Sequence, residues 1–155
     1  MGRRSAYLAL VTACGALAIG TAVAAADGSA TPARSMYLLK CSGCHRADGQ
    51  GAVDAGVPPF PGFVGSLAAD ANGRNYMLHV PGVRGSGLSD ADLTRVMNYL
   101  LDTWSPHTPR PIQRFTSDEV SRLRAQSLDD VVGYRRTLVA RLRKTGAPIA
   151  AYPWP

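Results

Sequence analysis

The stretch Cys41-Ser42-Gly43-Cys44-His45 carries the most chemical information in this chain. Two thiols at this spacing can each form a thioether bond to one vinyl group of the same porphyrin, and the adjacent imidazole can then bind the iron. A redox dithiol needs the two cysteines but not the histidine, and a zinc site needs two further ligands at finger spacing. The only other cysteine of the chain is Cys14. The pattern therefore predicts one covalently attached haem, bonded to Cys41 and Cys44, with His45 as the proximal ligand of its iron.

The N-terminus indicates that the protein is exported. Two arginines near the start precede a charge-free apolar stretch over 6–19, and three alanines at 24–26 suit cleavage by a signal peptidase. We expect residues 1–26 to be a signal peptide and the mature protein to be periplasmic. Two alternatives are an uncleaved leader that anchors the chain in the membrane and a lipid on Cys14, because the segment ending there resembles a lipoprotein cleavage box. No charge-free run after the leader reaches transmembrane length, so the mature chain is expected to have no transmembrane span.

Charge is distributed unevenly along the mature chain. Residues 27–109 hold six Arg and Lys against seven Asp and Glu, a net charge of −1, whereas residues 110–155 hold nine against four, a net charge of +5. This basic C-terminal third is either a solvated helix face or a docking patch for an acidic partner. We expect no nucleic-acid partner, because the chain is predicted to be exported and its basic stretch has no pattern of interleaved aromatic residues.

The pattern of apolar side chains predicts helices and no sheet. A helix over 33–40 leads into Cys41, a Gly- and Pro-rich stretch over 55–66 is irregular, and a short helix covers 73–80, followed by a loop over 83–87. Ser89 caps the clearest helix. Its apolar positions recur with the helical period: Leu93, Val96, Met97, Leu100, Leu101 and Trp104.

The C-terminal third also reads as helical. A capping box from Thr116 to Glu119 begins a short helix, and a longer one with one apolar side covers 128–144. Its basic residues are Arg135, Arg136, Arg141, Arg143 and Lys144. The segment 145–155 is rich in proline and has no helical pattern, so we expect a disordered tail.

The order of these pieces resembles class I c-type cytochromes. The resemblance covers about 31–104, and the segment Leu88-Ser89-Asp90-Ala91-Asp92-Leu93, followed by Asn98-Tyr99, is similar to the family's closing helix. It implies an all-α fold in which helices surround one covalent haem. The domains expected are a signal peptide over 1–26, a cytochrome c domain over 27–109, a basic helical extension over 110–144 and the tail over 145–155.

The resemblance also implies roles for single residues. Cys41, Cys44 and His45 match the family's haem c attachment sites and proximal ligand. Pro58 or Pro59 resembles the proline whose carbonyl accepts the N–H of the proximal histidine.

The chain departs from the family where the distal methionine is expected. The loop over 80–87, just before the closing helix, contains no Met. The nearest candidates are Met77 and His79, and the third alternative is that the protein supplies no sixth ligand. Met97 lies in an apolar stripe that suits core packing, and Met36 precedes the haem motif on the proximal side.

These observations predict a periplasmic monohaem cytochrome that carries single electrons between a donor and an acceptor. It would not be an enzyme, because no nucleophile–base pair or paired carboxylates are present. Its partners would be redox proteins such as a periplasmic dehydrogenase or oxidase. The alternative is a five-coordinate haem protein that binds a small molecule or has peroxidase-like activity.

Overall fold

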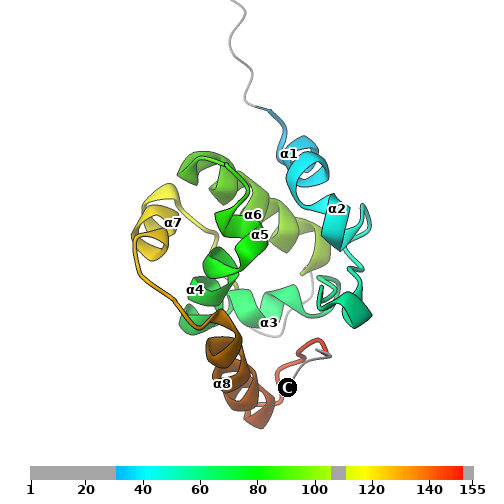
Figure 1. Cartoon of the computed structure of the whole chain (residues 1–155), viewed down its shortest axis with the longest axis vertical. Coiled ribbons are helices and arrows are strands. Elements are labelled where there is room, and N and C mark those ends of the chain that lie inside the picture. Colours follow the sequence, from blue (N-terminus) through cyan, green and yellow to red (C-terminus); the bar gives the residue numbers. More distant parts are fainter. Residues whose placement is uncertain (1–30, 106–110, 152–155) are drawn as a thin grey trace, which may run out of the picture. The chain divides into compact units, whose positions relative to one another are not determined.

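The structure is a computed structural model that describes residues 31–105 and 111–151. The expected leader, Cys14 and residues 152–155 lie outside these ranges. Within them the chain forms helices joined by turns and one isolated antiparallel bridge between Ala52 and Val57. The helices are α1 (Ala33–Lys40), α2 (Ser42–His45), η1 (Val53–Ala55), α3 (Val64–Ala68), α4 (Ala71–His79), α5 (Pro81–Arg84), α6 (Asp90–Trp104), α7 (Ser117–Arg124) and α8 (Val131–Lys144). The expected all-α fold is confirmed (Figure 1).

Helices α1 and α6 pack together through aromatic side chains. Tyr37 of α1 is fully buried, and its ring centroid lies 5.6 Å from that of Tyr99 and 5.1 Å from that of Trp104. The expected bounds of α1 are confirmed: the Pro32 carbonyl accepts the Met36 N–H at 3.1 Å at its start, and Cys41 leaves the helix at its end. This helix pair fixes where the haem motif begins.

Helix α6 is the longest element among the described residues, and it follows its sequence signals closely. The Ser89 hydroxyl accepts a hydrogen bond from the Asp92 N–H at 3.1 Å, which is the expected cap. The apolar stripe faces the core, and Met97 is only 3 % exposed. Met97 thus lies in the core, as expected for a residue of the apolar stripe.

The segment between the haem motif and α6 is more helical than the sequence predicts. Helix α3 begins at Val64, inside the stretch expected to be irregular, and α5 includes the first two residues of the expected 83–87 loop. Helix α4 begins at Ala71 instead of residue 73, because the Asp70 carboxylate accepts hydrogen bonds from the two N–H groups that follow Ala71. Helices shorter than two turns leave too little periodicity to be recognised from sequence.

The C-terminal extension packs onto the same core as residues 31–105. Helix α7 begins at its expected cap, with the Thr116 hydroxyl accepting from the Glu119 N–H at 3.2 Å. Helix α8 begins at Val131 instead of residue 128, because Asp130 caps it with a hydrogen bond from Gly133 at 2.7 Å. Helix α8 lies against α4.

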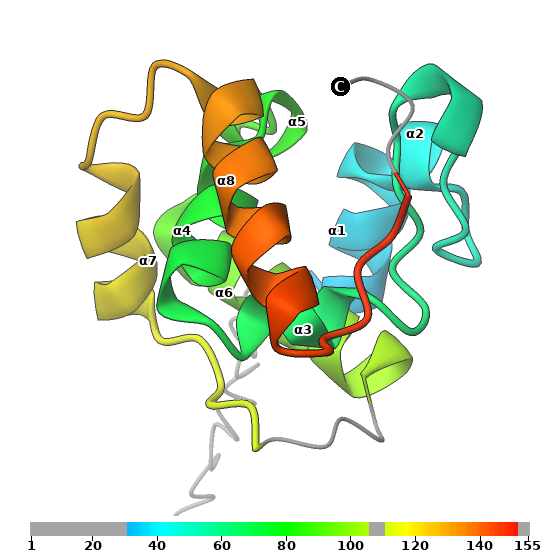
Figure 2. The same ribbon diagram turned by 90° about the horizontal axis from the view of Figure 1, so that it is seen from below.

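The start of the tail differs from the expectation of disorder. Residues 145–151 turn back from the end of α8 and run beside it, as Figure 2 shows for the red segment. Ala150 is 4 % exposed, and its carbonyl accepts a long hydrogen bond, 3.4 Å, from the buried guanidinium of Arg135. Ile149 packs against the core. Burial of these small apolar side chains holds a segment that has no helical pattern of its own.

Candidate haem site

One turn of helix brings the three residues of the haem motif onto one side of the chain. Cys41 stands at the junction of α1 and α2, and its carbonyl accepts the N–H groups of Cys44 at 3.2 Å and His45 at 2.9 Å. Residues three and four positions apart share a helix face. Cys41 is half-buried and Cys44 is exposed.

The Cys41 thiol is affected by its surroundings. Burial raises the pKa of the Cys41 thiol, and the neighbouring Cys44 raises it further. Both effects favour the neutral thiol of Cys41. The two thiols therefore differ in their surroundings, with Cys41 half-buried and Cys44 exposed.

The imidazole of His45 is oriented by the loop that follows the motif. Its Nδ1 is buried and makes no well-formed hydrogen bond, while the carbonyl of Pro58 lies close enough to act on the ring. Burial lowers the pKa of His45 and the Pro58 carbonyl partly opposes this. The ring stacks on Phe60, with centroids 4.1 Å apart. A hydrogen bond from Nδ1 to this carbonyl would leave Nε2 as the ring nitrogen for a metal.

A glycine makes this approach of the Pro58 carbonyl possible. Gly51 has φ +65°, and a Cβ on it would lie 2.4 Å from the Val57 oxygen and 2.8 Å from the Pro58 oxygen. Only a residue without a side chain lets the loop fold back so closely. Pro58, and not Pro59, is therefore the proline beside the histidine.

The chain leaves the motif through an unusual conformation that sequence reasoning missed. Arg46 has φ +61° and ψ +166°, a region used almost only by glycine. Tyr37 holds this residue by donating its hydroxyl to the Arg46 carbonyl at 2.6 Å. Burial raises the pKa of the Tyr37 phenol, which keeps the donor protonated. No sequence signal marks Arg46, because the conformation depends on a tyrosine nine positions earlier.

The two candidate distal residues have different surroundings. His79 is 1 % exposed, with Nδ1 2.8 Å from the Asn75 oxygen and Nε2 2.9 Å from the Gln126 oxygen. In this arrangement neither nitrogen of His79 is available to a metal. Met77, 6 % exposed, lies in the apolar core and has a thioether that needs no hydrogen bond.

Curated proteins of known family resemble this chain. A cytochrome c-552 of Thermus thermophilus is 30 % identical over 128 residues, which cover 70 % of this chain and 82 % of that protein. A second cytochrome c-552 of the same species is 29 % identical over 108 residues, or 57 % of this chain and 82 % of that protein. The chain belongs to the c-type cytochromes. No family model matches this cytochrome. It carries covalently bound haem c with iron, and it serves in electron transfer.

The residues around the motif fit that group. The buried ring of His45 lies beside the Pro58 carbonyl, an arrangement in which the protein can hold one ring nitrogen while the other binds a metal. Aromatic rings continue from Phe60 to Trp104, with centroids 5.4 Å apart, and give the site the apolar surroundings that a porphyrin needs. The cytochrome thus supplies two thiols, one oriented imidazole and an aromatic wall.

Proposed function

We propose that this cytochrome is a periplasmic carrier of single electrons whose haem is bonded to Cys41 and Cys44 and ligated by His45. The observation that carries the proposal is the single helical turn that presents both thiols and His45, whose ring is also acted on by the Pro58 carbonyl. The bound haem supplies an iron that alternates between two oxidation states. The protein orients the ligand, keeps water away and offers a surface for docking.

The surroundings of the His45 ring support this role. Donation of the Nδ1 hydrogen to the Pro58 carbonyl would fix the ring tautomer and make Nε2 a stronger ligand. The stacked ring of Phe60 limits rotation of the imidazole. A rigid site changes little between oxidation states, which favours fast electron transfer and needs no acid or base group.

Attachment can be tested by acid–acetone extraction of the purified holoprotein. The haem should remain on the polypeptide. Cys41→Ala and Cys44→Ala should each lose one thioether, seen as a shift of the pyridine haemochrome α band to longer wavelength. Cys14→Ala is the matched control, because the third cysteine lies outside the motif and should leave the band unchanged. Haem that extracts into the organic phase would disprove the assignment.

For the sixth position we propose Met77. His79 would have to leave a buried position in which its ring nitrogens lie 2.8 and 2.9 Å from carbonyl oxygens, whereas a thioether changes partners without leaving a polar group unpaired. The absence of Met from the loop over 80–87 favours one second candidate, a five-coordinate haem that binds small molecules.

Spectra of the oxidised protein distinguish these alternatives. Met77→Leu should abolish the near-infrared sulfur-to-iron band, while Met97→Leu, at a similarly buried position of α6, should preserve it. A high-spin wild-type protein that binds azide readily, and that Met77→Leu leaves unchanged, would establish the open site instead.

The proposed location rests on the leader. No helix among the described residues is long and apolar enough to cross a membrane. Mass spectrometry of the exported holoprotein should find a mature chain that begins near Ala25 or Asp27. A retained leader, or a lipid on Cys14, would place the same haem chemistry at a membrane.

The proposed partners are redox proteins such as a dehydrogenase or an oxidase. Two of the arginines expected to attract them have structural roles: Arg135 is buried, and Arg141 forms a two-pronged ion pair with Asp70 at 2.7 and 2.8 Å. Arg143 and Lys144, at the exposed end of α8, are better placed to steer an acidic partner. Changing both to Glu should slow association with such a partner most strongly at low salt.

A further inference from the structure

Helix α4 carries Met77 and leads into the short segment before α6, and most of its residues are buried. One face is fixed by α3, because a Cβ on Gly73 would lie 2.1 Å from the Leu67 oxygen. The position of α4 relative to the other helices therefore determines the position of the Met77 thioether.

Three polar contacts connect α4 to the C-terminal extension, one at each end of the helix and one in its middle. At its start, Asp70 caps α4 and binds Arg141 of α8. At its end, His79 meets the carbonyl of Gln126 at 2.9 Å. Arg74 forms the contact in the middle of the helix.

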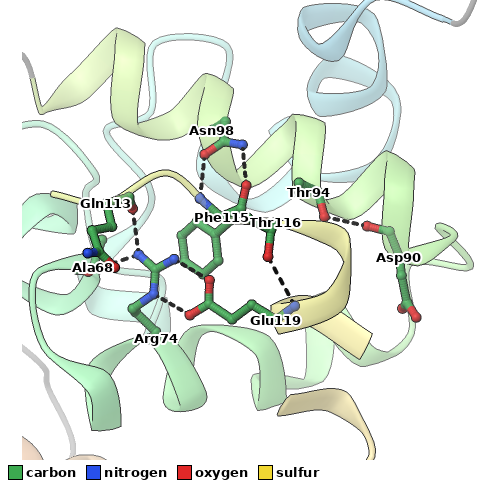
Figure 3. A network of polar contacts seen from close by, with 9 residues as sticks. All are labelled: Ala68, Arg74, Asp90, Thr94, Asn98, Gln113, Phe115, Thr116 and Glu119. Carbon is green, nitrogen blue, oxygen red and sulfur yellow. Dashed lines mark hydrogen bonds and ion pairs between the residues drawn. The ribbon is translucent and has the colours of Figure 1, made fainter. Parts of the chain in front are cut away.

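Arg74 is the strongest of these connections. Its guanidinium donates to both oxygens of Glu119 in α7, at 2.6 and 2.5 Å, and to the carbonyl of Gln113 at 2.9 Å (Figure 3). It also donates to the Ala68 carbonyl at 3.1 Å and lies 3.7 Å from the ring centroid of Phe115. The side chain is 10 % exposed, and that of Glu119 is 21 % exposed. A two-pronged pair shielded from water resists displacement far more than a surface pair does.

We propose that Arg74 and Glu119 are positioning residues for the distal side of the haem, through which the extension holds α4 and sets the strength of the sixth ligand. The inference rests on the proposed haem site and deepens it. The segment over 80–88 is short and lacks a Met, so the candidate ligand Met77 lies on α4 itself. In this proposal the contacts between α4 and the extension hold the distal side in place. The two residues act through α4, and their hydrogen bonds reach neither the thiols nor His45.

The test compares full-length holoproteins. Glu119→Gln keeps the shape of the side chain and removes the charge, and Arg74→Lys keeps the charge and removes the two-pronged geometry. The matched control is Asp102→Asn, because the pair of Asp102 with Arg114 also joins α6 to the extension but is more than half exposed and does not involve α4.

Three measurements are made on each variant: far-ultraviolet circular dichroism, the spectrum of the oxidised haem, and azide affinity for the ferric iron. Glu119→Gln and Arg74→Lys should retain helix content and covalent haem, weaken the near-infrared band and bind azide about tenfold more tightly, within the usual range of coupling between two sites. Glu119→Asp, which can rebuild one hydrogen bond, should lie between them and the wild type.

The outcomes separate this inference from the proposed sixth ligand. If both folded variants match Asp102→Asn in spectrum and azide affinity, the positioning role is overturned. If Met77→Leu leaves the spectrum unchanged while Glu119→Gln still alters azide affinity, the ligand assignment fails and the positioning role stands. If the Glu119→Gln and Arg74→Lys variants do not fold, two milder variants give the same comparison. They are Glu119→Asp and Arg141→Gln, the second of which removes the ion pair at the start of α4. Azide affinity equal to that of the wild type in both would overturn the inference.

Discussion

Replacing Asn98 with Leu should destabilise the protein by about 3 kcal/mol. Asn98 is 9 % exposed in α6, and its amide binds the main chain of Phe115 twice, accepting from the N–H at 2.8 Å and donating to the carbonyl at 3.0 Å. These two bonds satisfy buried backbone groups at the entry to α7. Leucine has a similar size but can satisfy neither group.

The magnitude follows from those two groups. A buried donor or acceptor left without a partner costs about 1–3 kcal/mol, so the two together cost about 2–6 kcal/mol. The added apolar surface of leucine returns about 1 kcal/mol. The net loss, about 1–5 kcal/mol, is a large part of the roughly 5–15 kcal/mol that is typical of a domain.

Guanidinium unfolding of the oxidised holoprotein measures this loss, followed by haem absorbance and by far-ultraviolet circular dichroism. Thr103→Ala, on the exposed side of the same helix, is the control and should change the free energy of unfolding by less than about 0.5 kcal/mol. If Asn98→Leu behaves like that control, the two hydrogen bonds do not hold the extension on α6 and the reasoning is wrong.

Three further predictions concern single sites. The hydrogen bond from Arg74 lowers the pKa of Glu119 despite the partial burial of that carboxyl. The ion pair therefore contributes its full stability above the ordinary pKa of the carboxyl and loses it as pH falls through the lowered pKa. The free energy of unfolding, measured as a function of pH, should show this loss in the wild type and a flatter profile in Glu119→Gln. Arg46→Gly should relieve the strain of φ +61° and raise stability by about 1 kcal/mol in chemical unfolding, whereas no gain would show that the conformation is not strained. Gly49→Ala should lower stability by about 2 kcal/mol or more and shift Trp104 fluorescence, because its φ is +75° and a Cβ would lie 2.7 Å from the indole; an unchanged midpoint would contradict this packing.

The arrangement that the sequence predicts best is local in origin. The start of α6 at Ser89 and the start of α7 at Thr116 follow from side chains that bond the backbone three positions later. The haem motif is equally local, since one helical turn is enough to bring Cys41 near Cys44 and His45. Such contacts close within a few residues, so their residue types and spacing carry the information.

Other features depend on partners far along the chain. Glu119 reads as the second half of a capping box, yet its carboxylate binds Arg74, 45 positions away, because a buried guanidinium offers it a stronger bond than an exposed helix terminus. His79 is one of three alternatives that the sequence leaves open for the sixth ligand, and folding places both of its ring nitrogens near carbonyl oxygens, one of them 47 positions away.

The C-terminal extension shows the same division. Its sequence predicts two helices and a basic face, and the helices are present with small shifts of their ends. Only the tertiary structure decides that Arg135 is buried and that Arg141 binds Asp70. The sequence alone shows how many basic side chains a segment has. Which of these side chains are free to bind a partner depends on the carboxylates and carbonyls that folding brings beside them. Those contacts form only when the helices pack against each other.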